Sequence, residues 1–377
     1  MYTLSFPGLG LEFQLNPVAI AIGNLSITWY GILISVGMLL AMVYAFKNAK
    51  KYGIIEDKLV DVVLVGVIFG LIGARLYYVA FKWDYYSQHL SEIYKTWEGG
   101  IAIYGGVIGA FLAGALMCRI RKVRVAPTLD LAAQGFLIGQ AIGRWGNFVN
   151  IEAFGSNTTL PWGMTSSKIT AYLSNAENVE ALTSLGVTVD PSAPVHPCFL
   201  YESIWCALGF LVLWLYSKHR RFDGEIFLFY LIWYGLGRSV IEGLRTDSLL
   251  WGKLRVSQVL AIAMVVVCFA IWAVLRTKIQ SAHDPAYRRP YGQTQAFSEE
   301  YEAYQQKLKN KAAKKKEKRT GAGKVQSVEI KEPENEAASE VVAEPLNGPK
   351  DRPFETDGAA EDEKTNKTAG EAQDTEE

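Results

Sequence analysis

The feature that most constrains this chain is a series of seven apolar runs, each close to the length that crosses a membrane. About twenty apolar residues in a helix span the hydrocarbon core of a bilayer, which is roughly 30 Å thick. The runs are residues 27–46, 59–81, 101–118, 129–149, 199–217, 224–243 and 256–275. A backbone in lipid has to satisfy its own hydrogen bonds, so each run is expected to be helical. The sequence therefore predicts an all-α polytopic membrane protein with seven transmembrane helices.

Basic residues in the links between these runs predict the orientation, because short cytoplasmic links are enriched in Lys and Arg. The links after the first, third and fifth runs are basic: Lys47, Lys50, Lys51 and Lys58, then Arg119, Arg121, Lys122 and Arg124, then Lys218, Arg220 and Arg221. The intervening links are poorer in basic residues, except that the sixth holds Arg245, Lys253 and Arg255. This alternation predicts an N-terminus outside and a C-terminus in the cytoplasm.

The two ends of the chain differ so much that its mean hydropathy of +0.10 describes neither. Residues 1–280 form the predicted membrane domain, and residues 281–377 are nearly all polar or charged, which predicts a disordered cytoplasmic tail. Residues 307–319 hold eight basic residues and one acid, and residues 328–377 hold sixteen acids against five bases. The tail is interpreted as solvated without a specific partner. Contact of its basic block with anionic lipid headgroups, and a transient helix over 297–319, are the alternatives.

Cysteine and histidine offer no metal or disulfide pattern. The four cysteines and four histidines are scattered, and none falls in a CxxC or a zinc-ligand spacing. We therefore expect no metal and no cofactor.

Three arginines lie inside predicted spans, where a charge is costly. Arg75, Arg144 and Arg238 belong to the second, fourth and sixth runs, all of which lead outward. At 1.5 Å per residue they lie roughly 21–24 Å from the inner edge of the core, which is one depth in the outer leaflet. The alternatives are side chains that reach the headgroups without a function, and an ion pair of Glu242 with a neighbouring arginine that joins helices.

The fourth run also carries a polar stripe. Gly139, Gly143, Asn147 and Asn150 share one helical face, with Arg144 at its edge. A guanidinium matches the geometry of phosphate, and asparagine amides add neutral donors. The stripe therefore predicts a site for an anionic group reached from the outer leaflet, such as a phospholipid headgroup.

Residues 143–155 read Gly-Arg-x-Gly-Asn-Phe-x-Asn-x-Glu-x-x-Gly, which resembles the signature of the prolipoprotein diacylglyceryl transferase family. Further blocks in the family's order extend the resemblance over residues 20–275: Trp29-Tyr30-Gly31, Gly73-Ala74-Arg75-Leu76, Glu98-Gly99-Gly100, His196-Pro197 with Leu200-Tyr201-Glu202, and Gly237-Arg238 with Glu242 and Arg245-Thr246-Asp247. The tail lies outside it.

The resemblance implies a seven-span enzyme of the bacterial plasma (inner) membrane whose active site faces the outer leaflet. Such an enzyme moves the sn-1,2-diacylglyceryl group of phosphatidylglycerol to the thiol of the lipobox cysteine in a prolipoprotein. The products are a thioether and glycerol phosphate, in the first step of lipoprotein maturation. The implied partners are phosphatidylglycerol, the lipobox peptide and the bilayer, and nucleic acid is not among them.

Positions that match the family's motifs take its roles by resemblance. Arg144 and Arg238 would hold the phosphate and stabilise the leaving group, and Glu152 would belong to the catalytic set. The residues that would bind or shape the phosphatidylglycerol site, besides Arg144, are Tyr30, Arg75, Asn147, Gly155, Glu202, Glu242 and Arg245.

The general base is less defined, because Tyr104 stands where many family members have a histidine. A thiol with a usual pKa of about 8.5 has to lose its proton to attack, and a phenol with a pKa near 10 is a poor base. Either neighbouring arginines tune Tyr104, or Glu152 or Glu202 takes the proton, or no dedicated base is needed.

An anion or lipid transporter that uses the same arginines is the main alternative function, and a purely structural membrane protein is a third. A transporter predicts a polar path that reaches both sides of the membrane. The inner halves of the spans offer mainly Asp130 and Gln134. The sequence therefore favours the transferase.

Overall fold

The structure is a computed structural model that describes residues 1–23, 25–246, 250–251, 254–281 and 289–324. It is mostly helical, and its contacts divide the chain into two units, Met1–Lys314 and Lys315–Glu377. The site and the contacts described below belong to the first unit.

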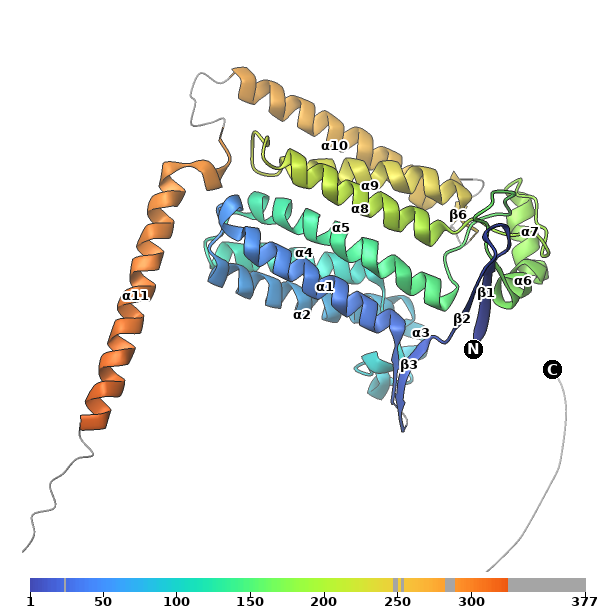
Figure 1. The fold of residues 1–377 in the computed structure, drawn as a ribbon, viewed down its shortest axis with the longest axis horizontal. Coiled ribbons are helices and arrows are strands. Elements are labelled where there is room, and N and C mark those ends of the chain that lie inside the picture. Colours follow the sequence, from blue (N-terminus) through green and yellow to red (C-terminus); the bar gives the residue numbers. More distant parts are fainter. Residues whose placement is uncertain (24, 247–249, 252–253, 282–288, 325–377) are drawn as a thin grey trace, which may run out of the picture. The chain divides into compact units, whose positions relative to one another are not determined.

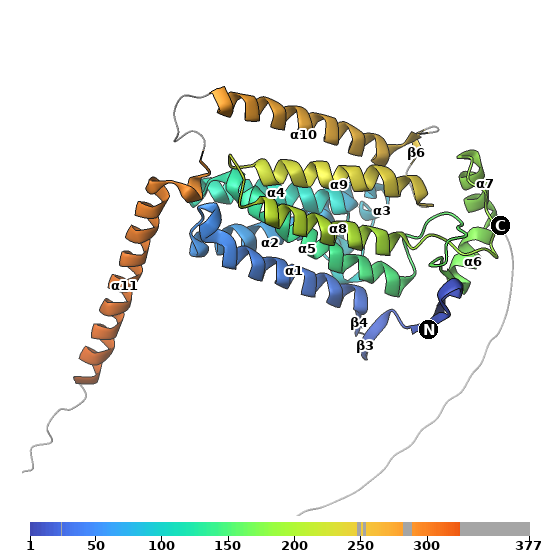
Figure 2. The same ribbon diagram turned by 45° about the horizontal axis from the view of Figure 1, so that its top comes forward.

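All seven apolar runs form long helices that lie side by side (Figures 1 and 2). They are α1 (Trp29–Asn48), α2 (Glu56–Phe81), α4 (Ile103–Ile120), α5 (Val125–Asn150), α8 (Cys198–Tyr216), α9 (Glu225–Leu244) and α10 (Val256–Ser281). Within the described residues, five of these helices are long and apolar enough to cross a membrane: α1 with its 3-10 extension to Tyr52, α2, α4, α8 and α10. Helices α5 and α9 are not among them, and they carry Arg144 and Asn147, and Arg238 and Glu242, of the predicted site.

Glycine brings neighbouring helices close together, because small residues let helix backbones approach each other. The clearest case is the contact of α2 with α4, where a Cβ added to Gly105 would clash with the carbonyl oxygen of Gly73. Helix α1 packs along α5, and α10 along α9.

The chain is not entirely helical, which corrects the all-α prediction. Strands β1 (Tyr2–Phe6), β2 (Leu11–Leu15) and β5 (Thr165–Ser166) form an antiparallel sheet, and β3 (Val18–Ile22) pairs with β4 (Leu25–Thr28). Strands β6 (Leu250–Trp251) and β7 (Leu254–Arg255) form a third pair. The N-terminal stretches before α1 are too short to span, and Pro7 and Gly10 close a turn between β1 and β2.

The sheet of β1, β2 and β5 and the short helices α6 (Ser167–Ser174) and α7 (Ala176–Ser184) cluster beyond the C-terminal end of α5 (Figure 1). Leu4, Phe154, Met164, Ile169 and Phe199 are among the buried side chains of their shared core. This small core covers the end of the helices at which the predicted site lies.

The opposite end of the helices is fixed by a buried ion pair. Asp130 near the start of α5 accepts hydrogen bonds of 2.8 Å from the backbone N–H groups of Gly224 and Phe227. Arg220, in the link between α8 and α9, lies 3.5 Å from the same carboxylate, and both side chains are fully buried. The pair joins α5 to the start of α9.

The predicted disorder of the tail is wrong for residues 295–324, which form helix α11 (Gln295–Lys324). Phe297, Tyr301 and Tyr304 recur at helical spacing, and Phe297 is buried. This aromatic stripe packs the start of α11 against the other helices. The many charged residues around it in the sequence led to the prediction of disorder. Residues 282–288 and the acidic block 328–377 lie outside the described residues.

Candidate functional site

A charge cluster forms where the first turns of α8 meet the C-terminal ends of α5 and α9. At its centre is Glu202, whose side chain is 8% exposed. Its Oε1 lies 3.1 Å from Nη1 of Arg245 and 3.5 Å from Nη1 of Arg238, and its Oε2 forms an ion pair with Nη2 of Arg144. One carboxylate thus holds three guanidinium groups that come from two helices and the residue after α9.

A second carboxylate completes the cluster. Oε2 of Glu242, one turn after Arg238 on α9, lies 2.6 Å from Nη2 of that arginine. Arg255 donates a hydrogen bond to the backbone carbonyl of Glu242. Among the described residues, the guanidinium groups of Arg144, Arg238 and Arg245 gather around two carboxylates, and buried charges need partners of opposite sign. The cluster is therefore suited to an anion.

The predicted Glu242 pairing is thus present, but it is one part of a larger network. The basic sixth link, which departs from the positive-inside pattern, is accounted for by the same network. Its Arg245 and Arg255 bind Glu202 and the carbonyl of Glu242.

Helix α5 ends beside the cluster in an unusual turn. Ile151 and Ala153 both have left-handed backbone conformations, with φ of 52° and 53°. Side chains rarely adopt this region, and such strain concentrates at functional sites. The N–H of Glu152, between them, donates to the carbonyl of Asn147 at 2.9 Å. The turn exposes Glu152, whose side chain is 50% accessible.

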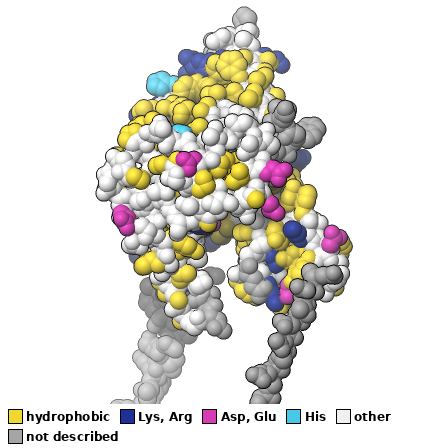
Figure 3. All heavy atoms as spheres, turned by 90° about the vertical axis from the view of Figure 1, so that its right-hand side faces the viewer, with side chains coloured by type: hydrophobic (Ala, Val, Ile, Leu, Met, Phe, Trp, Pro, Cys, Tyr) yellow, Lys and Arg dark blue, Asp and Glu magenta, His cyan; other side chains and the backbone are white. Residues whose placement is uncertain are grey.

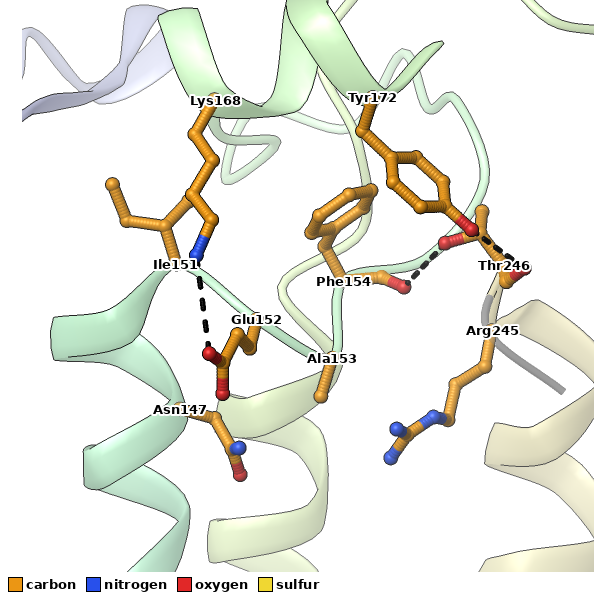
Figure 4. Close-up of a pocket in the computed structure, with 9 residues that line it drawn as sticks. All are labelled: Asn147, Ile151, Glu152, Ala153, Phe154, Lys168, Tyr172, Arg245 and Thr246. Atoms are coloured by element: carbon orange, nitrogen blue, oxygen red, sulfur yellow. Dashed lines mark hydrogen bonds and ion pairs between the residues drawn. The ribbon is translucent and has the colours of Figure 1, made fainter. Parts of the chain in front are cut away.

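This turn borders a pocket of about 290 Å³ (Figure 4). The lining residues are Asn147, Ile151, Glu152, Ala153, Phe154, Lys168, Tyr172, Arg245 and Thr246. Asn147 and Arg245 point toward each other across it (Figure 4). Because Arg245 also binds Glu202, the pocket adjoins the charge cluster.

Helix α6 contributes a cation to the pocket. Nζ of Lys168 lies 3.8 Å from the Glu152 carboxylate and donates to the carbonyl of Asn150 at 2.8 Å. Nearby, the Tyr172 hydroxyl donates to the Thr246 carbonyl at 3.3 Å. The molecular face at this end shows many hydrophobic side chains and few charged ones (Figure 3).

Gly155 positions the cluster through its backbone. Its N–H donates to the carbonyl of His196 at 2.9 Å, and it forms an antiparallel bridge with Arg245. A Cβ here would lie 2.8 Å from Cβ of His196, 2.9 Å from Sγ of Cys198 and 3.0 Å from the carbonyl oxygen of Leu244. Only glycine lets the segment after α5 pass between the start of α8 and the end of α9.

Tyr30 lies in the first turn of α1 and packs against α5. A Cβ on Gly146 would clash with the Tyr30 ring, which is itself partly exposed. The predicted site residues Tyr30 and Asn147 therefore both lie along the last turns of α5, on which Arg144 is also placed.

Arg75 has its own set of partners. Its guanidinium donates to the carbonyls of Glu92, Ile93, Gly99 and Gly100 at 2.6–2.8 Å, and its side chain lies 5.2 Å from the Tyr86 ring centre. These contacts fold the link between α2 and α4 onto α2. Arg75 shares the predicted depth of the other arginines but is bound to this link.

Two further polar residues bear on the question of the base. Tyr104 lies in the first turn of α4, is 56% exposed and makes no hydrogen bond among the described side-chain contacts. Nδ1 of His196 lies 3.1 Å from the Tyr201 hydroxyl, which accepts a hydrogen bond from Trp162 at 2.7 Å. Burial lowers the pKa of His196. Neither residue contacts the Glu202 carboxylate in the described network.

The sequence reasoning did not assign roles to Lys168 and Arg255. Lys168 is the only Lys or Arg residue in the long link between the fourth and fifth runs, which is a usable signal. Among the described residues, no group of three His, Cys, Asp or Glu side chains is placed to hold a metal ion.

Comparison with known proteins identifies the family. A model of the family "Prolipoprotein diacylglyceryl transferase" matches residues 17–274. The phosphatidylglycerol–prolipoprotein diacylglyceryl transferase of Listeria innocua serovar 6a is 42% identical over 272 residues, which cover 72% of this chain and 94% of that protein. The enzymes of the same name from Staphylococcus haemolyticus and Lysinibacillus sphaericus are each 41% identical, over 71% and 72% of this chain and 92% and 96% of their own lengths. With five span-length apolar helices, the chain is a multi-pass membrane protein and belongs to the prolipoprotein diacylglyceryl transferase family.

Proposed function

We propose that the chain carries out the transfer reaction of its family at the Glu202 cluster. In this reaction the diacylglyceryl group of phosphatidylglycerol passes to the thiol of a prolipoprotein's lipobox cysteine. The observation that carries the proposal is the convergence of Arg144, Arg238 and Arg245 on one buried carboxylate, beside a pocket open to a polar headgroup.

The transfer reaction needs a site that stabilises the negative charge of the departing phosphate more than it needs a group that protonates it. The thiolate attacks the glyceryl carbon next to the phosphate, the carbon–oxygen bond breaks, and glycerol phosphate leaves with the electron pair. The side chains of Arg144 and Arg238 are 22% and 21% exposed, against 11% for that of Arg245. They would bind the phosphate and stabilise its growing charge. Fixed cations in a poorly solvated site are effective in this role because they need no reorganisation.

The remaining residues support the pair of Arg144 and Arg238, which we call the phosphate clamp. Glu202 and Glu242 hold the guanidinium groups in place before the lipid arrives. Asn147 and Arg245 would contact the headgroup from the pocket. We assign the thiol proton to Glu152, because its carboxylate is half exposed in the pocket and only loosely paired with Lys168.

The shape of the site rests on the other predicted residues. Gly155 and Tyr30 act through packing. Arg75 acts indirectly, through the link that it folds onto α2.

We further propose that α5 and α9 also cross the bilayer, giving seven spans with the N-terminus outside and the C-terminus in the cytoplasm. Their polar side chains would be shielded by α1, α8 and α10, which pack against them. The basic links then face the cytoplasm, and the Glu202 cluster lies at the opposite, outer-leaflet end of the bacterial plasma membrane. Residues 1–280 would form the membrane domain and residues 281–377 the cytoplasmic segment.

The transporter alternative gains no support from the inner end of the described helices. There Asp130 and Arg220 are fully buried and paired with each other, so they close the path that a transporter would need.

The decisive experiment is reconstitution of the purified chain with phosphatidylglycerol and a lipobox peptide, with detection of the thioether product by mass spectrometry. Arg144→Ala and Arg238→Ala should abolish transfer while the protein still inserts into the membrane. Arg121→Ala is a matched control, because Arg121 forms a surface pair with Asp61, 2.7 Å away, and lies at the other end of the helices. Full activity of both site variants would refute the phosphate clamp.

A further inference from the structure

Helix α11 begins with a segment that is docked on the helical unit. Residues 291–304, which we call the cap, include the aromatic stripe of Phe297, Tyr301 and Tyr304. Phe297 is 3% exposed, and Gly292 lies so close to Gly53 that a Cβ on either would clash with the other's backbone. The cap is therefore held at the turn between α1 and α2.

Tyr291 fixes the start of the cap to two other links. Its backbone N–H donates to Asp223 at 3.1 Å, in the link between α8 and α9. Its ring centre lies 3.7 Å from the guanidinium carbon of Arg124, in the link between α4 and α5. Its hydroxyl donates to Glu300 at 2.8 Å. All these links belong to the end of the helices opposite the Glu202 cluster.

The rest of the cap is anchored to the first turn of α2. Nζ of Lys58 lies 2.9 Å from Glu300, and the Tyr301 hydroxyl donates to Glu56 at 3.1 Å. One turn later, the Tyr304 hydroxyl donates to Asp57. These contacts place Tyr304 beside the very start of a membrane-length apolar helix.

The helix becomes strongly basic directly after this anchor. Lys307, Lys309, Lys311 and Lys314 are all exposed, and no acid occurs from Ala303 to Lys316. At 1.5 Å per residue, these lysines lie about 5 to 15 Å beyond Tyr304 along the helix. Charges interact over a Debye length of about 8 Å at physiological salt. The first of these lysines are therefore close enough to interact electrostatically with charged groups that surround the start of α2.

We propose that Lys307, Lys309, Lys311 and Lys314 bind the anionic phospholipid surface at the cytoplasmic face of the membrane. The proposal rests on the orientation proposed above, which puts the start of α2 at that face. The phosphate headgroups of anionic lipids complement these lysines. Lys307, Lys311 and Lys314 share one face of α11, at spacings of four and three residues. Each lysine at the surface strengthens association about fivefold, on the order of a hundredfold for these three. The family match ends at residue 274, so this surface is an addition to the transferase domain.

The test uses the full chain in nanodiscs of neutral phosphatidylcholine, with or without one part in three of phosphatidylglycerol. An environment-sensitive fluorophore is attached to an Asn310→Cys variant, because the four native cysteines are buried. We expect a blue-shifted emission in the anionic nanodiscs that high salt reverses. The shift should be lost in the K307Q/K309Q/K311Q/K314Q variant and kept when the same four positions are changed to arginine.

Equal emission in neutral and anionic nanodiscs would overturn the proposal. So would a shift that is independent of the lipid and disappears when residues 328–377 are deleted, because the lysines would then bind the acidic segment of their own chain. Both nanodisc leaflets contain the same lipids, so the result does not depend on the orientation of the chain. Transfer activity is measured on the same samples, and its absence alongside the expected shift would count only against the proposed function.

Discussion

Replacing Gly155 with alanine tests whether the backbone at the end of α5 positions the charge cluster. The added Cβ would lie 2.8 Å from Cβ of His196 and 3.0 Å from the carbonyl oxygen of Leu244. Carbon atoms in ordinary contact are about 3.5–4.0 Å apart, so His196 has to move by about 0.7 Å or more. The closer approach of carbon to oxygen means that the Leu244 carbonyl has to move by roughly a few tenths of an ångström. Such overpacking costs about 1–3 kcal/mol of folding free energy.

The same movement should reach the cluster, because Arg245 directly follows Leu244. A displacement of Leu244 would lengthen the 3.1 Å contact of Arg245 with Glu202 and bring it to the edge of hydrogen-bonding range. A misplacement of 1 Å at a catalytic site can reduce the rate about 100-fold. We therefore expect Gly155→Ala to lose most of its transfer activity, with a moderate fall in its thermal unfolding temperature.

The assay compares the transfer rate and the unfolding temperature of Gly155→Ala and Gly114→Ala. Gly114 lies in α4, and a Cβ there meets no atom within 4 Å. The Gly114→Ala variant should keep its transfer activity, and its unfolding temperature should stay the same or rise, because alanine favours a helix more than glycine does. If the two variants have the same rate and the same unfolding temperature, close packing at Gly155 does not position the cluster.

Three further outcomes are expected. Arg75→Lys keeps the charge but cannot reproduce the guanidinium fork that binds four carbonyls. The variant should lower the free energy of unfolding by about 2 kcal/mol or more. Proteolysis at Lys95 in the link should become faster, and an unchanged rate of proteolysis would contradict this. Tyr104→Phe should leave the rate of transfer unchanged because the exposed phenol makes no described hydrogen bond, and a slower variant would restore Tyr104 as a catalytic group. Since burial lowers the pKa of His196, the folded protein binds fewer protons than the unfolded chain, and its unfolding free energy should fall as the pH drops below about 6.5. His196→Gln should weaken that dependence in thermal unfolding, and an identical pH profile would contradict it.

The long helices could be predicted from the sequence because an apolar run of about twenty residues is expected to be helical. The strands β1 and β2 could not be predicted, because an alternation of polar and apolar residues over five positions is a weak signal compared with seven long apolar runs. Helix α11 was hidden for a related reason. Its docking depends on Phe297, Tyr301 and Tyr304, three aromatic residues within a segment dominated by charge.

Most of the predicted site residues lie near one another in the structure, but their arrangement could not be predicted from the sequence. Counting residues along a span gives the depth of a side chain but not the direction in which it points. Arg75 and Arg144 were therefore predicted at one depth and in one site, although Arg75 binds the carbonyls of a link and Arg144 binds Glu202. The central position of Glu202 depends on how α5, α8 and α9 pack, and the spacing of residues within one helix gives no information on that packing.

The buried pair of Asp130 and Arg220 has a consequence for biogenesis. About 90 residues separate the two in the chain, so a ribosome that adds about 5–20 residues per second makes the arginine about 5 to 20 s after the aspartate. Through that interval the nascent α5 holds an acid without the partner that neutralises it in the finished protein. Stable burial of the start of α5 has to wait for α8 and the link that follows it, so the packing of α5 is completed only after α8 has been synthesised.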